Sequence, residues 1–475
     1  MSSLIVIIFT ILFFIGYAIE DTLVMASALI GLFIYISYYC CKNINSHITL
    51  FVFMIAFFTF LMGRLILPLF YDVSELVYDN GGYDFSMKTN IHMYLSVYLA
   101  LLFVPIGYAT YFKSPRPLSQ NMVLDDNLNF IRKRFRLIIY FSAPFAFLLV
   151  LEKIYFVFSE GYSALYIDYQ SRLPYVITVL GAFFSLSFYI FMATLPSKRE
   201  ALYPILMYLS LAVLSLGTGQ RGSFILSILF VIMYFFMRNT IIPGETWIGR
   251  KSIIILLLSI PLFLIFLFAF AYIRVEEELG DSKMTTNILV SFIGQQGVSV
   301  EVIGFGYDFE NMFPKGRCYL LGDVIDYFRH NIFSQYLFGA EPVEGQTVKR
   351  ALEDNSFDAT LTYLSKPDLY LDGGGLGGCY IAEAYKDLGY IGICIVSFIY
   401  GAILSIIPQW CRKNVIYGAV GLIMFNQIVF APRAHAIKFV LVFISMVTFL
   451  LFFYLYILKK SSCKNIKHEK SKIIV

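Results

Sequence analysis

Charged side chains are scarce in this sequence. Asp, Glu, Lys and Arg make up 14% of its 475 residues, whereas 59% are hydrophobic and the mean hydropathy is +0.74. A soluble globular domain carries about 25% charged residues. The composition therefore excludes a protein whose main solvent is water. The net charge of +4 is small, and we expect no nucleic acid partner.

Residues that hold metals and cofactors are also few. The chain has five histidines and seven cysteines, and none of them has the spacing of a zinc site. The glycine-rich run from Asp372 to Gly378 is not a dinucleotide-binding fingerprint, because its spacing differs and no strand is predicted before it. We therefore expect neither a metal ion nor an organic cofactor.

Long hydrophobic runs are what the sequence has in abundance. The hydrocarbon core of a bilayer is about 30 Å thick, and a helix needs roughly 20 apolar residues to cross it. Such runs recur along nearly the whole chain without the alternation of β-barrel strands. We predict an all-α polytopic membrane protein with about twelve transmembrane helices, the first of them retained because no basic segment precedes it. The predicted spans are residues 3–18, 22–40, 48–71, 91–112, 137–158, 174–195, 203–217, 222–237, 252–273, 389–408, 415–431 and 437–458.

Basic residues collect in every second connection between these spans. By the positive-inside rule these connections are cytoplasmic, and both termini then lie inside. The chain divides into transmembrane helices over 1–273, a large outer loop over 274–388, further transmembrane helices over 389–458 and a basic cytoplasmic tail over 459–475. The basic residues concerned are Lys113, Arg116, Arg132, Lys133, Arg134, Arg136, Lys198, Arg199, Arg238, Arg250, Lys251, Arg412 and Lys413.

The large loop, residues 274–388, is too long for a simple connector and should fold. Apolar residues recur at three- and four-residue spacing from Leu320 to Leu337, which predicts one amphipathic helix. We expect the loop to be mostly helical. Cys318 and Cys379 are the cysteines expected in the outer compartment, so they are candidates for a disulfide.

Several Lys and Arg residues are predicted at the outer membrane boundary, although the positive-inside rule disfavours cations there. If the bundle brings three of them together, they form a site for a phosphate or diphosphate, because guanidinium groups pair bidentately with phosphate oxygens. The alternative is that each long side chain reaches separately into the interface. The residues concerned are Arg64, Lys153, Arg221, Arg274, Arg433 and Lys438.

Four of the candidate residues lie in three distinctive local sequences. Arg221 occupies a glycine-flanked turn between two short spans, where the alternative is a solvated turn residue. Arg433 and His435 share the small-residue turn 431–436, and histidine is the usual general base near neutral pH. Glu383 follows the glycine-rich run, where it could orient a sugar hydroxyl or pair with an arginine. For His435 the alternative is an interfacial histidine with a backbone partner.

Together these features resemble the Wzy-type polymerases of bacterial surface polysaccharides. The resemblance rests on the Gly-Gln-Arg-Gly-Ser turn at 219–223, the late outer loop, and the glycine-rich run that leads to Ile381-Ala382-Glu383-Ala384-Tyr385 and Tyr390-Ile391-Gly392. It implies a GT-C-like glycosyltransferase fold in the bacterial inner membrane, surrounded by membrane lipids, with its active site facing the periplasm. It also implies undecaprenyl diphosphate-linked oligosaccharides as donor and acceptor, no metal, and a chain-length regulator protein as a candidate partner.

The resemblance assigns roles to the candidate residues. Arg221 and Arg433 would stabilise the diphosphate leaving group, and Arg274, Arg64 and Lys438 would help to bind it. His435 or Glu383 would remove the proton of the attacking sugar hydroxyl, and direct attack would invert the anomeric carbon. The alternatives are an O-antigen ligase with a similar donor, or a lipid-linked oligosaccharide flippase, which favours short outer loops and charges in the membrane midplane.

Overall fold

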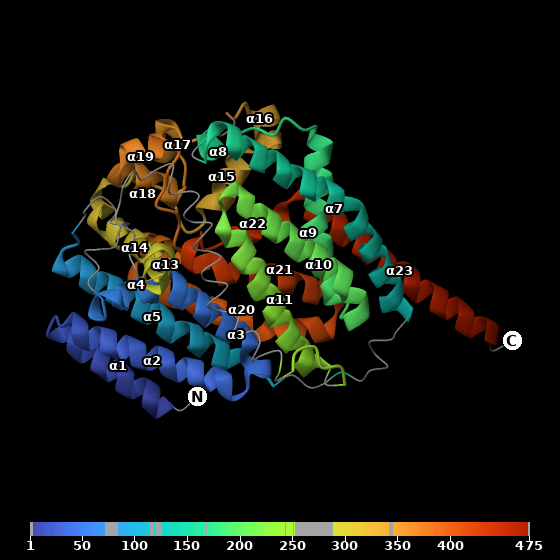
Figure 1. Cartoon of the computed structure of the whole chain (residues 1–475), viewed down its shortest axis with the longest axis horizontal. Coiled ribbons are helices and arrows are strands. Elements are labelled where there is room, and N and C mark those ends of the chain that lie inside the picture. The colour runs from blue at the N-terminus through green and yellow to red at the C-terminus, as the bar shows by residue number, and fades with distance from the viewer. Residues whose placement is uncertain are drawn as a thin grey trace.

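The computed structural model describes residues 3–71, 84–114, 118, 126–162, 164–167, 169–242, 244–249, 251, 288–341 and 345–473. All secondary structure over these residues is helical (Figure 1). The prediction of an all-α polytopic membrane protein is therefore confirmed. Over the described residues, the main helices of the bundle are α1 Ser3–Ala18, α2 Thr22–Lys42, α3 Ile44–Phe57, α5 Met87–Tyr111, α7 Asp126–Glu160, α9 Tyr175–Ala193, α10 Lys198–Ser215, α11 Arg221–Ile241, α20 Tyr380–Lys413, α21 Val415–Phe430, α22 Lys438–Ile444 and α23 Met446–Ile473.

The hydrophobic runs coincide with these helices. Over the described residues, nine helices are long and apolar enough to cross a membrane, and α22 with α23 forms a tenth candidate bent by 61°. α1 is a shorter apolar helix of 16 residues. The predicted span at 252–273 lies outside the described residues. The third span continues beyond α3 as a π-helical turn, Phe58–Met62, and then as α4, Gly63–Ile66.

Polar side chains mark where several helices begin. The Asp21 carboxylate accepts hydrogen bonds from the backbone N–H groups of Leu23 and Val24, which starts α2. Ser197 and Glu200 form a capping box at the start of α10. These caps satisfy backbone N–H groups that the first helical turn leaves without partners. They place the helix starts within a few residues of the positions that the sequence predicts.

The close contact of α5 with α20 depends on glycine. A Cβ atom on Gly401 would lie 1.9 Å from the carbonyl oxygen of Val104, and one on Gly107 would lie 2.0 Å from that of Phe398. Either distance is a severe overlap, so the two backbones can approach only because both positions lack a side chain. α20 also changes direction at Gly389, whose φ of 61° suits glycine. The segment Tyr380–Leu388 of α20 therefore leads into the membrane-spanning part at an angle.

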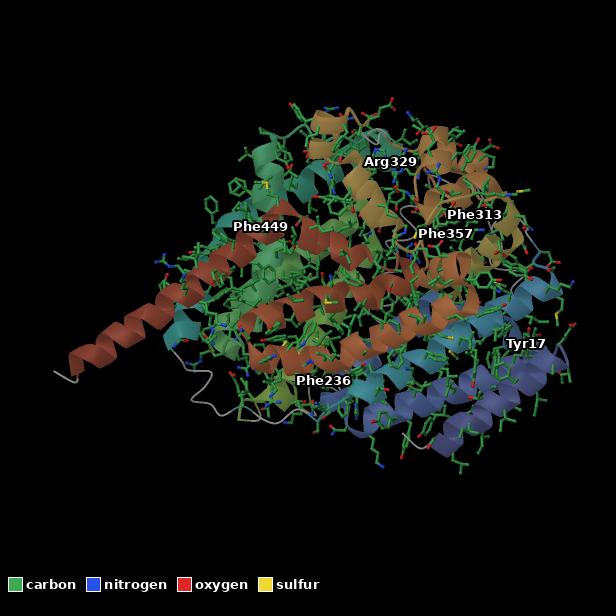
Figure 2. All side chains as sticks on the ribbon, turned by 180° about the vertical axis from the view of Figure 1, so that it is seen from behind. Tyr17, Phe236, Phe313, Arg329, Phe357 and Phe449 are labelled. Carbon is green, nitrogen blue, oxygen red and sulfur yellow. The ribbon has the colours of Figure 1, made fainter. Side chains whose placement is uncertain are left out.

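The helices of the large loop gather at one end of the bundle, which we call the loop end (Figure 1). In Figure 2, Phe313, Phe357 and Arg329 lie at this end, and Phe236 of α11 lies at the opposite end. The helices are α13 Ile288–Gln296, α14 Ser299–Asp308, α15 Gly322–His330, α16 Ile332–Phe338, α17 Val348–Glu353, α18 Phe357–Ser365 and α19 Pro367–Leu371.

Two predictions for the loop are wrong in detail. The single amphipathic helix is split into α15 and α16, because Asn331 adopts an extended conformation and its side chain caps α16 by accepting from the Ser334 N–H. Cys318 and Cys379 are free cysteines and form no disulfide. The Cys318 thiol donates to the Asp387 carboxylate at 3.3 Å, whereas Cys379 is fully buried in the hydrophobic core.

Two buried arginines lie at the end of the bundle opposite the loop end. Arg132 of α7 and Arg238 of α11 are 3% and 1% exposed. Both guanidinium groups donate to carbonyl oxygens just beyond α9, including that of Leu195, and each pairs with a glutamate, Glu200 or Glu245. Cations are favourable beside the carbonyl-rich end of a helix. Part of the predicted cytoplasmic basic set therefore has a structural role.

Candidate active site

The turn between α21 and α22 organises the candidate site. Pro432 lies in a 3-10 turn, Ala431–Arg433, that ends α21. The Ala436 N–H donates to Glu383 Oε2 at 2.9 Å, and the Tyr400 hydroxyl donates to the Ala436 carbonyl oxygen. Both partners belong to α20, so this helix holds the turn from two sides. We call residues 431–438 the site turn.

Glu383 and His435, both predicted as candidate bases, are in direct contact. Glu383 Oε1 lies 2.6 Å from His435 Nδ1, and the Glu383 side chain has 0% exposure. The short distance is typical of a charge-assisted hydrogen bond. The glycine-rich run passes beside the ring, where a Cβ on Gly378 would lie 3.5 Å from His435 Cε1 and 3.3 Å from the Ala434 carbonyl carbon. Glycine at this position lets the run pack directly against the site turn.

Two further carboxylates face the other nitrogen of the His435 ring. Asp358 Oδ2 lies 3.6 Å from Nε2, and Asp323 Oδ1 lies 4.0 Å from it. Asp358 belongs to α18 and Asp323 to α15, so two loop helices meet the ring opposite α20. The ring therefore lies among three acidic side chains. We call Glu383, His435, Asp358 and Asp323 the acidic cluster.

The charged groups of the acidic cluster shift one another's pKa values. Burial alone would lower the pKa of His435, but Asp358 and Glu383 outweigh it and raise the pKa well above its usual value. Burial would raise the pKa of Asp358, but attraction to His435 and the Ser356 hydrogen bond hold it well below its usual range. Burial also raises the pKa of Asp323, partly offset by His435. The carboxylates of the cluster therefore favour the imidazolium form of His435.

A cavity of about 800 Å³ contains three of the predicted cations. Arg221, Arg433 and Lys438 all line it. Arg221 is the first residue of α11 and follows Gly219, whose φ of 76° makes the turn into the helix. The walls also carry apolar groups and neutral hydroxyl and amide groups, among them Phe60, Leu186, Tyr189, Tyr208, Ser227, Gln296, Asn426 and Phe430.

The site turn links the cavity to the acidic cluster. Arg433 Nη1 donates to the Gln296 carbonyl oxygen at 3.0 Å, and its guanidinium lies 5.8 Å from the centre of the Phe60 ring. Lys438 lines the cavity and also lowers the pKa of Asp323 by attraction. Arg433 and Lys438, which line the cavity, flank His435 in the site turn, so this short segment joins the cavity to the acidic cluster. Such an arrangement can stabilise developing negative charge on one side and receive a proton on the other.

Comparison with known proteins identifies the family. The model of the O-antigen polysaccharide polymerase Wzy family matches residues 1–465, almost the entire chain. The chain belongs to this family. No curated protein and no solved structure matches it. The predicted resemblance is confirmed, and the family makes this a multi-pass membrane polymerase of O-antigen polysaccharide.

In this Wzy family member the remaining predicted cations lie elsewhere or are not described. Arg64 forms an ion pair with Glu301 and donates to the Gly294 carbonyl oxygen at 2.8 Å, so it ties α4 to α13 and α14. It does not line the cavity. Lys153 lies 5.7 Å from the centre of the Tyr169 ring, while Glu152 binds the 169–172 segment. Arg274 lies outside the described residues.

Sequence reasoning missed Asp323 and Asp358 in this family member. Asp323 lies on the polar side of the predicted amphipathic segment, and Asp358 follows the N-cap Ser356 of α18. Neither position breaks a rule of membrane insertion, because both belong to the large loop. Only the fold brings them to His435. They are therefore new candidates for the site.

One other group in the described part of the chain has metal-ligand types close together. Ligand atoms of Asp326, His330 and Asp354 lie within 4.8 Å of one another. His330 Nε2 already lies 3.0 Å from Asp354 Oδ1, and both Asp326 oxygens accept hydrogen bonds from Asn355. Arg329 also lies 3.7 Å from Asp354. The three side chains therefore form a hydrogen-bonded network that holds α15 in place.

The raised pKa of His435 predicts how its ring titrates. In histidine-labelled protein, the His435 NMR resonance, identified by its loss in His435→Asn, should remain that of the imidazolium well above pH ~6.5. Glu383→Gln should move the transition to lower pH, because one stabilising carboxylate is lost. Since the folded pKa is raised, the pair stabilises the fold below about pH 6.5 and loses this contribution as pH rises through the folded pKa.

Glu353→Gln is the matched control for this titration. Glu353 is exposed on α17, and its substitution by Gln removes the same charge as Glu383→Gln. It should leave the His435 transition in place. A wild-type His435 that titrates near pH ~6.5 would contradict the ion-paired cluster.

Proposed function

We propose that this chain polymerises undecaprenyl diphosphate-linked repeat units at the periplasmic face of the inner membrane. Family membership supplies the reaction class, a glycosyltransferase-type polymerase of O-antigen. One observation supports the proposed site of the reaction. The site turn places Arg433 and Lys438 in the lining of the cavity and His435 in the acidic cluster. A donor and an acceptor can thus meet at one short segment.

The cavity suits the diphosphate of the donor. Breaking the anomeric C–O bond leaves negative charge on the diphosphate, and Arg221, Arg433 and Lys438 place positive charge around one volume. Guanidinium groups in a preorganised setting stabilise such charge in the transition state more than in the ground state. These cations can take the part that a divalent metal takes in other phosphate sites, so we propose a metal-independent reaction.

The acidic cluster suits the hydroxyl group of the acceptor. The attacking sugar oxygen must lose its proton as it bonds to the anomeric carbon, and ionised carboxylates beside His435 can receive it. The site turn carries Arg433 and Lys438 of the cavity as well as His435 of the acidic cluster, so a direct displacement between donor and acceptor can take place at this segment. Direct attack opposite the leaving group inverts the anomeric configuration.

The distribution of basic residues supports the proposed orientation. Lys133, Arg134, Lys198, Arg199 and Lys413 lie at helix ends near the buried Arg132 and Arg238, opposite the loop end. The positive-inside rule would make that end cytoplasmic and the loop end periplasmic. The acidic cluster would then face the periplasm. This placement also agrees with a large folded loop that covers the site.

The cation site predicts the kinetics of purified protein. In liposomes with purified lipid-linked repeat units, Arg221→Ala and Arg433→Ala should each slow polymerisation by about 100- to 1,000-fold, the loss typical of one oxyanion donor. Lysine at either position should restore activity only in part, because it loses the bidentate geometry. Chelator should leave the wild-type rate unchanged. Polymer length and rate are read by gel electrophoresis.

Arg172→Ala is the matched control, because Arg172 is an exposed cation in the segment between α8, Ala164–Ile167, and α9. It should polymerise at the wild-type rate. Full activity of both cavity variants would refute the diphosphate role, and loss of wild-type activity with chelator would refute metal independence. Transfer to lipid A core instead of chain growth would favour the ligase.

Orientation is tested by labelling single cysteines in intact cells. In a cysteine-free background, Glu353→Cys on α17 should react with a membrane-impermeant maleimide, since the loop end is proposed to be periplasmic. Lys133→Cys on α7 should react only after the cells are permeabilised. Both positions are exposed in the structure, so accessibility within the fold does not differ. The reverse pattern would overturn the periplasmic placement of the site.

A further inference from the structure

Glu383 is poorly placed to take a proton from a substrate. Its side chain has 0% exposure, so no hydroxyl can reach it in this structure. Oε1 is engaged by His435 Nδ1 at 2.6 Å, and Oε2 accepts from the Ala436 N–H at 2.9 Å. A general base must come within hydrogen-bond reach of the proton that it removes. The geometry therefore gives Glu383 the role of fixing and charging the His435 ring.

The surroundings of His435 favour the form of the ring that already holds a proton, and this form cannot act as a general base. Around the ring stand Glu383 from α20, Asp358 from α18 and Asp323 from α15. Lys438 from α22 and Arg350 from α17 act on the two aspartates by attraction, and Ser356 donates to Asp358. The negative groups nearest the ring favour the imidazolium. In that state both ring nitrogens are donors, and neither can receive a proton.

Asp358 combines solvent access with an oxygen, Oδ2, that is held by an ion pair alone. Its Oδ1 is anchored by the Ser356 hydroxyl and by the Ala359 N–H at 2.8 Å. Its Oδ2 faces His435 Nε2 at 3.6 Å, which is within ion-pair range but longer than a hydrogen bond. The side chain is 35% exposed, compared with 18% for Asp323. A hydroxyl group can approach Oδ2 while the carboxylate remains held through Oδ1.

We propose that Asp358 is the proton acceptor of the transfer reaction and that His435 acts beside it as a permanent cation. The acceptor oxygen forms a bond to the anomeric carbon, and the bond from that carbon to the diphosphate oxygen breaks. The electron pair of the broken bond leaves with the diphosphate, and the hydroxyl proton passes to Asp358 Oδ2. Solvent later removes that proton through the exposed side of Asp358. Asp323 and Glu383 are positioning residues that hold the imidazolium.

This inference rests on the proposed function and makes separate predictions. In the liposome assay, Asp358→Asn should lower kcat by about 100- to 10,000-fold, the usual range for a general base. The KM for the lipid-linked donor should stay within about twofold, because the cations that bind the diphosphate are intact. Asp323→Asn should lower kcat less and shift the His435 NMR transition to lower pH. The exposed Asp368→Asn on α19 is the matched control and should behave as wild type.

The pH dependence of kcat separates Asp358 from His435 as the base. With Asp358 as the base, the wild-type rate should be nearly flat from about pH 6 to about pH 8, because the pKa of Asp358 is held well below its usual range by His435 and Ser356. With His435 as the base, the rate should rise about tenfold per pH unit below the raised histidine pKa. A flat profile supports the proposal, and a tenfold rise per unit overturns it.

The two levels of the proposal fail in distinguishable ways. If the wild-type protein forms no polymer, the proposed function fails. If the wild type polymerises and Asp358→Asn keeps the kcat of Asp368→Asn, only the role of Asp358 fails. Folding of each variant is checked by the His435 resonance and by size-exclusion chromatography. If Asp358→Asn loses both the His435 resonance and the elution profile of the folded protein, the role of Asp358 is decided by the pH profile of the wild-type protein, which needs no variant.

Discussion

The buried carboxyl group of Glu383 is the constraint on which the site depends. A carboxylate with no exposed surface is costly unless charge and hydrogen bonds compensate it within the protein. The His435 ring and the Ala436 N–H provide that compensation from the site turn. The turn is thereby fixed against α20, and with it the directions of Arg433 and Lys438. One buried pair thus sets the geometry of both the cavity and the acidic cluster.

The cavity and the acidic cluster are assembled from distant segments of the chain that meet at this turn. The cavity draws on α9, α10, α11 and α21, whereas the acidic cluster draws on α15, α18 and α20. A diphosphate requires cations and a reacting hydroxyl requires a proton acceptor. Each set can therefore act on a different part of one reaction.

The sequence was informative wherever a residue broke a rule of membrane insertion. Hydrophobic runs located the helices, because the bilayer sets their length. Arg221 and Arg433 drew attention because cations at the outer membrane boundary need a reason, and three of the five predicted diphosphate-binding cations share the cavity. Glu383 drew attention through the glycine-rich run before it. Asp323 and Asp358 gave no such signal, since acidic residues are ordinary in a solvated loop. Their approach to His435 depends on tertiary packing, as does the break at Asn331 between α15 and α16.

The central claim is that donor and acceptor meet across the site turn. The most direct test is a cryo-EM structure of the protein in lipid nanodiscs with a non-hydrolysable, phosphonate-linked analogue of the lipid diphosphate sugar. The account predicts phosphate density between Arg221 and Arg433 inside the cavity, with the first sugar directed toward His435 and Asp358. Phosphate density away from both arginines, or a sugar directed away from the acidic cluster, would contradict it.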